Sequence, residues 1–324
     1  MADIKYISLS TKPTAKLSYT FHPPTPTPQT TSKKPKPKTL IVFLTGLGLP
    51  QTSWFPAITK LKETHPNLPS ILTYDRYGQG QSDRDPADDA AKDPSHGHDC
   101  LSVVTDLRQL ITQVSEENLG IPESETDSVQ LVFVANSIGC AIARLYAQSY
   151  PYTVAGMVLL DSILANSDFV SIYPDPDAGD FNPASLPAGI SPDDIRSERE
   201  GVRRIFHPSV GSKEGLSRLN LATLLPHSSS PNLTGPNGSG TWITVVGHDF
   251  EAFVEENAKM GRRRELTRKY VNPYWNRYNE GLVKITEEGR GKGPLIAQGA
   301  GHFVQRDRPD FVVQELCEIL GKIE

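Results

Sequence analysis

One serine stands where a strand is expected to turn directly into a helix. Residues 129–134 form an apolar run typical of a buried strand, and the pattern predicts a helix over 138–148. Ser137 lies between them, within Ala135-Asn-Ser-Ile-Gly139, which is close to the G-x-S-x-G pattern of a nucleophile elbow. Such a turn presents the hydroxyl for attack on a carbonyl carbon. The alternative is a serine that only caps the helix.

A histidine follows the last expected strand. His302 lies in Gly299-Ala-Gly-His-Phe303, directly after the apolar residues 294–297. Parallel sheets place their sites at the C-terminal ends of the strands. There, a neutral imidazole can take the proton of Ser137 and later return it to the leaving group. The alternative is a histidine that only stabilises its loop.

A glycine-rich loop follows the first core strand, in Phe43-Leu-Thr-Gly-Leu-Gly48. Loops of this kind can direct a backbone N–H at the oxyanion that forms when a carbonyl is attacked. We expect the N–H groups of Leu47 and Ile138 to be the two donors, and Gly46 and Asn136 to lie beside the substrate.

Strands and helices must alternate to bring these residues together. Apolar runs that predict strands occur at residues 4–9, 17–21, 40–44, 71–74, 129–134, 154–160, 242–246 and 294–297. Helical spacing of apolar residues, or helix start and stop signals, occur at residues 103–114, 138–148 and 309–320, with Gly321 expected to close the last helix. This order predicts an α/β fold with a doubly wound, mostly parallel sheet.

Two stretches interrupt that order. Residues 23–38 are almost entirely Pro, Thr, Ser and Lys, and we expect them to form an exposed, mobile loop. Residues 163–240 contain no clear strand and a helical pattern around 192–206, so we expect a largely helical cap over one end of the sheet. The core is then made of residues 1–162 and 241–324.

The composition excludes several other classes of function. The 324 residues carry 33 basic and 38 acidic side chains, a net charge of −5, which does not favour nucleic acid as a partner. No apolar run reaches the roughly 18 residues of a membrane helix, and no signal peptide is evident, so we expect a cytoplasmic protein without membrane insertion. Three scattered cysteines and the spacing of His96 and His98 fit neither a disulfide framework nor a common zinc signature.

These motifs together resemble the α/β-hydrolase family over nearly the whole chain after residue 38. More closely, the sequence resembles fungal α/β-hydrolases of toxin and secondary-metabolite biosynthesis. Two positions depart from the wider family, since Thr45 and Asn136 replace histidines that are common there. The resemblance rests on Thr45–Gly48, Tyr74–Asp83, Ser95–Cys100, Val134–Gln148, Val158–Ser162 and Gly301–Asp307.

The resemblance implies a carboxylate that orients His302, and two positions are open. Family precedent puts this acid after the sixth strand, here Asp161, or after the seventh, here Asp249. We favour Asp249 because the seventh-strand position is the commoner one, and Glu251 is a third candidate. The acid would hold the histidine tautomer and stabilise the imidazolium.

The expected function is therefore a serine hydrolase without a cofactor or metal. Its substrate would be an ester, lactone or thioester of a small apolar metabolite. Ser137, His302 and Asp249 would be the catalytic residues. The resemblance suggests a polyketide-type compound. The alternatives are a hydrolase-like binding or receptor protein without turnover, and a lyase or cyclase that uses the same pocket. Family members that open epoxides or remove halides use an Asp nucleophile, whereas position 137 is Ser.

Overall fold

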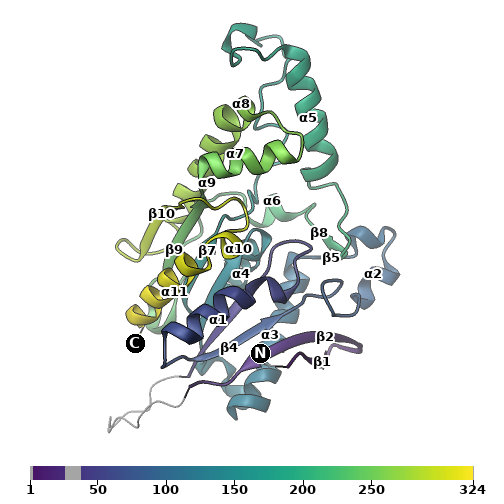
Figure 1. Ribbon diagram of the computed structural model, residues 1–324. Coiled ribbons are helices and arrows are strands. Elements are labelled where there is room, and N and C mark those ends of the chain that lie inside the picture. Colours follow the sequence, from purple (N-terminus) through teal and green to yellow (C-terminus); the bar gives the residue numbers. More distant parts are fainter. Residues whose placement is uncertain (1–2, 26–37, 324) are drawn as a thin grey trace.

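A single eight-stranded sheet forms the centre of the chain (Figure 1). The computed structural model describes residues 3–25 and 38–323, so the loop expected at 23–38 lies, apart from its ends, outside the described residues. The strands run β1-β2-β4-β3-β6-β7-β9-β10 across the sheet. Their bounds are β1 Lys5–Leu9, β2 Lys12–His22, β3 Thr39–Leu44, β4 Ser70–Tyr74, β6 Gln130–Asn136, β7 Val154–Leu160, β9 Trp242–His248 and β10 Gly291–Ala297.

From β4 to β10 every pair of neighbouring strands is parallel. Only β1 and β2 run antiparallel to their neighbours. The C-terminal ends of β3, β6, β7, β9 and β10 therefore meet at one edge of the sheet. This is the edge at which a sheet of this kind places a site.

Helices cover both faces of the sheet, as Figure 1 shows. On one face lie α1 (Phe55–Thr64) and α11 (Pro309–Ile323), which pack against each other. On the other lie α3 (Cys100–Leu119) and α4 (Ile138–Ser149). Because both faces are covered, the central strands are apolar at successive positions and not only at alternate ones.

Strand β3 shows this double burial directly. Leu40 and Val42 belong to the core that contains α3 and α4, whereas Ile41 and Phe43 belong to the core that contains α1 and α11. All four side chains are at most 1% exposed. The strand is thus fixed in register from both sides, and its C-terminal loop leaves from a rigid position.

The expected strands are all present, and each apolar run falls on one strand. The helix predicted over 309–320 differs at its end: Gly321 lies inside α11, which continues to Ile323. Shorter elements connect the core. They are α2 (Pro86–Ala90), β5 (His98–Asp99), α10 (Val304–Asp307) and 3₁₀ turns at Gln51–Trp54, Pro94–His96, Glu123–Ser128, Pro183–Ser185 and Pro236–Gly238.

The segment between β7 and β9 contains less helix than expected. Its α-helices are α5 (Pro192–Phe206), which has the bounds the sequence suggests, and the four-residue α6 (Leu221–Leu224). A capping box at Ser191 and Asp194 starts α5. The two-residue strand β8 (Leu216–Ser217) pairs with β5 and so ties this segment to the core.

A second excursion leaves the sheet after β9. It comprises α7 (Phe250–Lys259), α8 (Arg264–Leu266), a π-helical turn at Thr267–Val271, and α9 (Asn272–Leu282). In Figure 1, α5, α7 and α8 gather at one end of the molecule, beyond the C-terminal ends of β7 and β9. Within residues 3–25 and 38–323, no helix has both the length and the apolar character needed to cross a bilayer.

Candidate active site

Ser137 lies in a strained turn between β6 and α4. Its backbone has φ 56° and ψ −123°, a conformation that residues other than glycine rarely adopt. The turn is held to the end of β7, since the Ser137 amide donates to the Leu160 carbonyl (3.2 Å) and the Ile163 amide donates to the Ser137 carbonyl (3.1 Å). Gly139 is required because a Cβ there would lie 2.4 Å from the Leu44 carbonyl oxygen. The geometry is that of a nucleophile elbow.

The glycine-rich loop after β3 lies directly against this elbow. A Cβ on Gly46 would lie 3.3 Å from the Cβ of Ser137, so the two backbones approach closely. Within the described part of the chain, no hydrogen bond joins the N–H of Leu47 or of Ile138 to another residue. The expectation that these two groups bind a developing oxyanion stays a prediction.

A buried ion pair fixes the loop from behind. The Arg76 guanidinium donates to the carbonyls of Thr45 (2.8 Å) and Gly46 (2.9 Å). It also forms a bidentate ion pair with Glu214, in which Nε and Nη2 each donate to one carboxylate oxygen at 3.2 Å. The Glu214 carboxylate accepts in addition from the Gly48 amide (3.0 Å). Burial alone would lower the pKa of Arg76, but Glu214 raises it, so the guanidinium stays charged.

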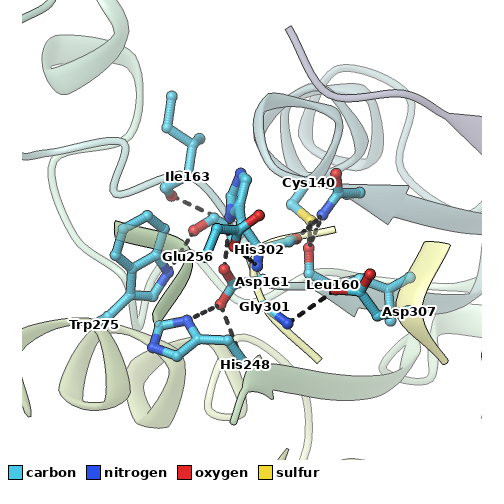
Figure 2. A network of polar contacts seen from close by, with 12 residues as sticks. Cys140, Leu160, Asp161, Ile163, His248, Glu256, Trp275, Gly301, His302 and Asp307 are labelled. Carbon is cyan, nitrogen blue, oxygen red and sulfur yellow. Dashed lines mark hydrogen bonds and ion pairs between the residues drawn. The ribbon is translucent and has the colours of Figure 1, made fainter. Parts of the chain in front are cut away.

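His302 contacts the carboxylate of Asp161. Its Nδ1 lies 2.6 Å from Asp161 Oδ2, a short charge-assisted hydrogen bond (Figure 2). Asp161 directly follows β7 and His302 follows β10, so the sheet brings together residues that are 141 positions apart. The Asp161 side chain is fully buried and its backbone has φ 41°.

The contact expected between Asp249 and His302 is not formed. Strand β9 ends at His248, and Asp249 turns away to become the N-cap of α7, accepting from the amides of Glu251 and Ala252. Its other oxygen accepts from the Gly299 amide (3.1 Å). These backbone hydrogen bonds, led by that from Gly299, lower the pKa of Asp249. The structure thus gives Asp249 a helix-capping position and gives the contact with His302 to the alternative, Asp161.

A second histidine shares the Asp161 carboxylate. His248 Nδ1 lies 2.8 Å from Asp161 Oδ1, opposite the oxygen that faces His302 (Figure 2). Burial alone would raise the pKa of Asp161, but the two histidines, His248 first, lower it to about 2. The carboxylate is therefore ionised at neutral pH.

Other groups fix the backbone around His302. The His302 amide donates to Glu256 Oε2 (2.7 Å), and its carbonyl accepts from Asn136 Nδ2 (3.0 Å). Asn136 also donates to the Leu160 carbonyl and is fully buried, so it links β7 to the histidine loop. The sequence predicts Asn136 and Gly46 beside the substrate, but neither is among the residues that line the cavity above Ser137.

A cavity of about 370 Å³ opens above these residues. Ser137, His302 and Leu47 lie in its wall, together with residues from both excursions of the chain. Its remaining wall is mostly apolar. The lining residues from 163–240 are Ile163, Phe169, Ile172, Tyr173, Val202, Ile205, Phe206 and Arg218, and those from 250–303 are Phe253, Glu256, Asn257, Met260, Arg262, Val271, Trp275 and Phe303.

The side chains that suggested other chemistry have structural partners. His98 Nδ1 lies 2.8 Å from Asp88, and His96 contacts Ser217 and the Ser209 carbonyl. In the ranges 3–25 and 38–323, no group of three or more His, Cys, Asp or Glu residues is arranged to hold a metal ion. Burial raises the pKa of the Cys140 thiol, which disfavours its thiolate.

His248 and Glu214 are not among the residues that the sequence predicts for the site. A signal for His248 is present, because it ends a buried strand directly before the candidate acid Asp249. Glu214 carries no such signal. Its contact with Arg76 spans 138 positions and depends on how the long segment after β7 folds back onto the core.

Comparison with known proteins agrees with this geometry. A sequence model described as the alpha/beta hydrolase family matches residues 41–315. No curated protein sequence matches the chain.

Solved structures share the fold at low sequence identity. A thermophilic esterase from Thermogutta terrifontis, with malate bound, is 15% identical with a TM-score of 0.53 and 99% of both chains covered. The epoxide hydrolase VrEH1 from Vigna radiata is 12% identical with a TM-score of 0.53, covering 99% of this chain and 98% of that one. A carboxylesterase structure from Nitrososphaera gargenis is 14% identical with a TM-score of 0.52, covering 98% of both. At these identities the likeness establishes the architecture alone.

The ion pair behind the glycine-rich loop yields a stability prediction. Glu214→Gln removes the charge that compensates the buried Arg76, and breaking such a pair costs about 3 kcal/mol or more. We expect a corresponding loss in the free energy of unfolding, measured by urea denaturation. Glu200→Gln, on the exposed side of α5 with its side chain 52% exposed, is the matched control and should change stability by less than about 0.5 kcal/mol. Equal effects of the two substitutions would contradict the role given to Glu214.

Proposed function

Because the chain belongs to the alpha/beta hydrolase family, we propose that it is a serine hydrolase that cleaves an ester, lactone or thioester bond. The observation that carries the proposal is the convergence of Ser137, His302 and Asp161 at one edge of the sheet, with Ser137 and His302 in the wall of one cavity. A strained serine at an elbow, a histidine and a buried acid form the constellation that acyl transfer requires.

In the proposed reaction His302 removes the proton of Ser137 as the hydroxyl oxygen attacks the substrate carbonyl. The new C–O bond places the negative charge on the carbonyl oxygen, where the N–H groups of Leu47 and Ile138 stabilise it. His302 then protonates the leaving alcohol or thiol, and the acyl group stays on Ser137. Water repeats the sequence, with His302 as base and then acid, and releases the carboxylic acid.

Asp161 would hold His302 in the tautomer whose Nδ1 carries the proton, and would stabilise the imidazolium formed during the transfer. Its distance of 2.6 Å from Nδ1 and its complete burial support this role. The low pKa of Asp161 supports it also, because the proton then stays on the histidine.

The cavity wall supports a small, apolar substrate. Apolar and aromatic side chains make up most of the wall, and the volume of about 370 Å³ suits a small metabolite. We treat residues 163–240 as a cap, since they supply much of this wall. The proposal that the substrate is a polyketide-type secondary metabolite rests on the resemblance of the sequence to fungal enzymes. Cleavage of a lactone would follow the same reaction steps as cleavage of an ester.

The neighbour from Vigna radiata is an epoxide hydrolase. We favour this activity less for the present chain. Epoxide opening in this family uses a carboxylate at the elbow, and this chain has Ser137 there. The N–H groups of Leu47 and Ile138, which bind no other residue of the described chain, also suit an acyl oxyanion.

The nucleophile can be tested first. Ser137→Ala should leave ester turnover lower by roughly a million-fold, as loss of a triad member can do, and should abolish labelling by a fluorophosphonate probe. Removal of one hydroxyl opens no large cavity, so thermal unfolding should be almost unchanged. Full hydrolysis by a clean Ser137→Ala preparation would refute the serine-hydrolase assignment.

Substitutions of Asp161 and Asp249 test which carboxylate orients His302. Asp161→Asn keeps the shape but favours the wrong tautomer of His302, and kcat should fall about ten-thousand-fold. Asp249→Asn keeps an oxygen that can cap α7, and kcat should stay within about threefold. Steady-state kinetics with one ester decides between them, and the opposite ranking would return the acid to Asp249.

The cap can be tested with two residues of similar exposure. Ile205 is 53% exposed and lies in the cavity wall, whereas Leu219 is 58% exposed and does not. Ile205→Ala should lower kcat/KM for a bulky apolar ester about tenfold and leave that for an acetyl ester nearly unchanged. Leu219→Ala should affect neither. If Ile205→Ala lowers both constants in parallel, residues 163–240 act through stability and not through selection of the substrate.

A further inference from the structure

The second histidine on the Asp161 carboxylate occupies a closed site of its own. His248 is the last residue of β9 and is 2% exposed. Phe253 of α7 stacks on its ring, with centroids 3.9 Å apart and an interplanar angle of 19°. The ring of Trp275 of α9 lies nearly perpendicular to that of His248, with centroids 5.6 Å apart. His248 does not line the substrate cavity.

Both ring nitrogens of His248 face oxygen atoms. Nδ1 lies 2.8 Å from Asp161 Oδ1, and Nε2 lies 3.2 Å from Asn272 Oδ1. The orientation of the Asn272 amide is fixed, because its Nδ2 donates to the Phe250 carbonyl (3.1 Å), which can only accept. A ring placed between two acceptors needs a proton on each nitrogen to satisfy both.

The charge balance supports that doubly protonated ring. Burial alone would lower the pKa of His248, but Asp161 and then the Asn272 hydrogen bond raise it. A buried cation is tolerated beside a buried anion. The pair formed by His248 and Asp161 is neutral as a unit, and His302 is the third member of the cluster.

We propose that His248 is a positioning residue that binds Asp161 as an imidazolium and holds the carboxylate so that Oδ2 faces His302. This inference rests on the proposed serine-hydrolase function. Two donors from His248 reach the same oxygen, the ring Nδ1 at 2.8 Å and the backbone amide at 3.3 Å. They fix the rotation of the carboxylate, and the remaining oxygen is directed at His302 Nδ1.

The rings of His248 and His302 share one carboxylate. The other charged groups that face the two rings are Glu256 of α7, which accepts from the His302 amide and is paired with Arg306, and Asp249 next in the chain. None of these is altered in the variants below.

Two variants separate the hydrogen bond from the charge. His248→Asn keeps an N–H donor near the position of Nδ1 but cannot carry a charge, whereas His248→Leu removes both. In His248→Leu we expect kcat to fall about ten- to a hundredfold, the cost of a misplaced catalytic group, with KM within about twofold because the residue lies outside the cavity. In His248→Asn we expect most of the plateau kcat to return.

The split between kcat and KM, together with the rescue by His248→Asn, gives a readout that a purely structural role would not change. Unchanged kcat in both variants would overturn the proposal. So would a fall in kcat that His248→Asn does not restore, because the residue would then serve the fold only.

The protonation state can be measured without turnover. In the ¹⁵N-labelled wild-type protein at about pH 8, well above the ordinary histidine pKa, the ring signals of His248, assigned by their loss in His248→Asn, should show both nitrogens protonated. If one ring nitrogen of His248 carries no proton, the proposal is overturned, even if His248→Leu does not fold. Ser137→Ala separates the two levels of inference: if it keeps full activity the serine-hydrolase function fails, and if it is inactive the His248 variants judge the positioning role alone.

Discussion

A single buried carboxylate determines how this site is built. Asp161 is fully buried, and an ionised carboxylate that leaves water has a large desolvation cost unless charges and hydrogen bonds replace the water. The chain meets this constraint with two imidazole rings on opposite oxygens, at 2.6 and 2.8 Å. The ends of β7, β9 and β10 must therefore be neighbours, which the parallel order of the sheet provides.

The same edge of the sheet carries a second buried charge pair, which stabilises the backbone opposite the nucleophile. Arg76 donates to the carbonyls of Thr45 and Gly46, and Glu214 accepts from the Gly48 amide, so the pair fixes the backbone of the glycine-rich loop. The strain at Ser137 is compatible with a stable fold because β7 and the close packing at Gly139 hold the turn on both sides. The geometry of Ser137 and of the glycine-rich loop therefore depends on contacts made by residues that do not react.

Much of the fold could be predicted from the sequence, because strands buried on both faces leave continuous apolar runs, and the elbow at Ser137 has a local pattern. The acid could not be assigned. Asp161 and Asp249 both follow buried strands, and the choice depends on where β9 ends and on whether Asp249 is taken up by the amides of α7. Residues 163–240 contain less helix than the sequence predicts, because proline-rich turns held by backbone hydrogen bonds have no periodic signature. Glu214 could not be found, since its partner is far away in sequence.

The anchor at Glu214 has a consequence for how such a protein can change over generations. Residues 163–240 supply one carboxylate to the core, where Glu214 compensates the charge of Arg76 and accepts from the Gly48 amide. A replacement of the whole segment must therefore supply an acid at that one point, or Arg76 is left buried without a compensating charge. Divergence of the segment is thus constrained at a position that does not line the cavity.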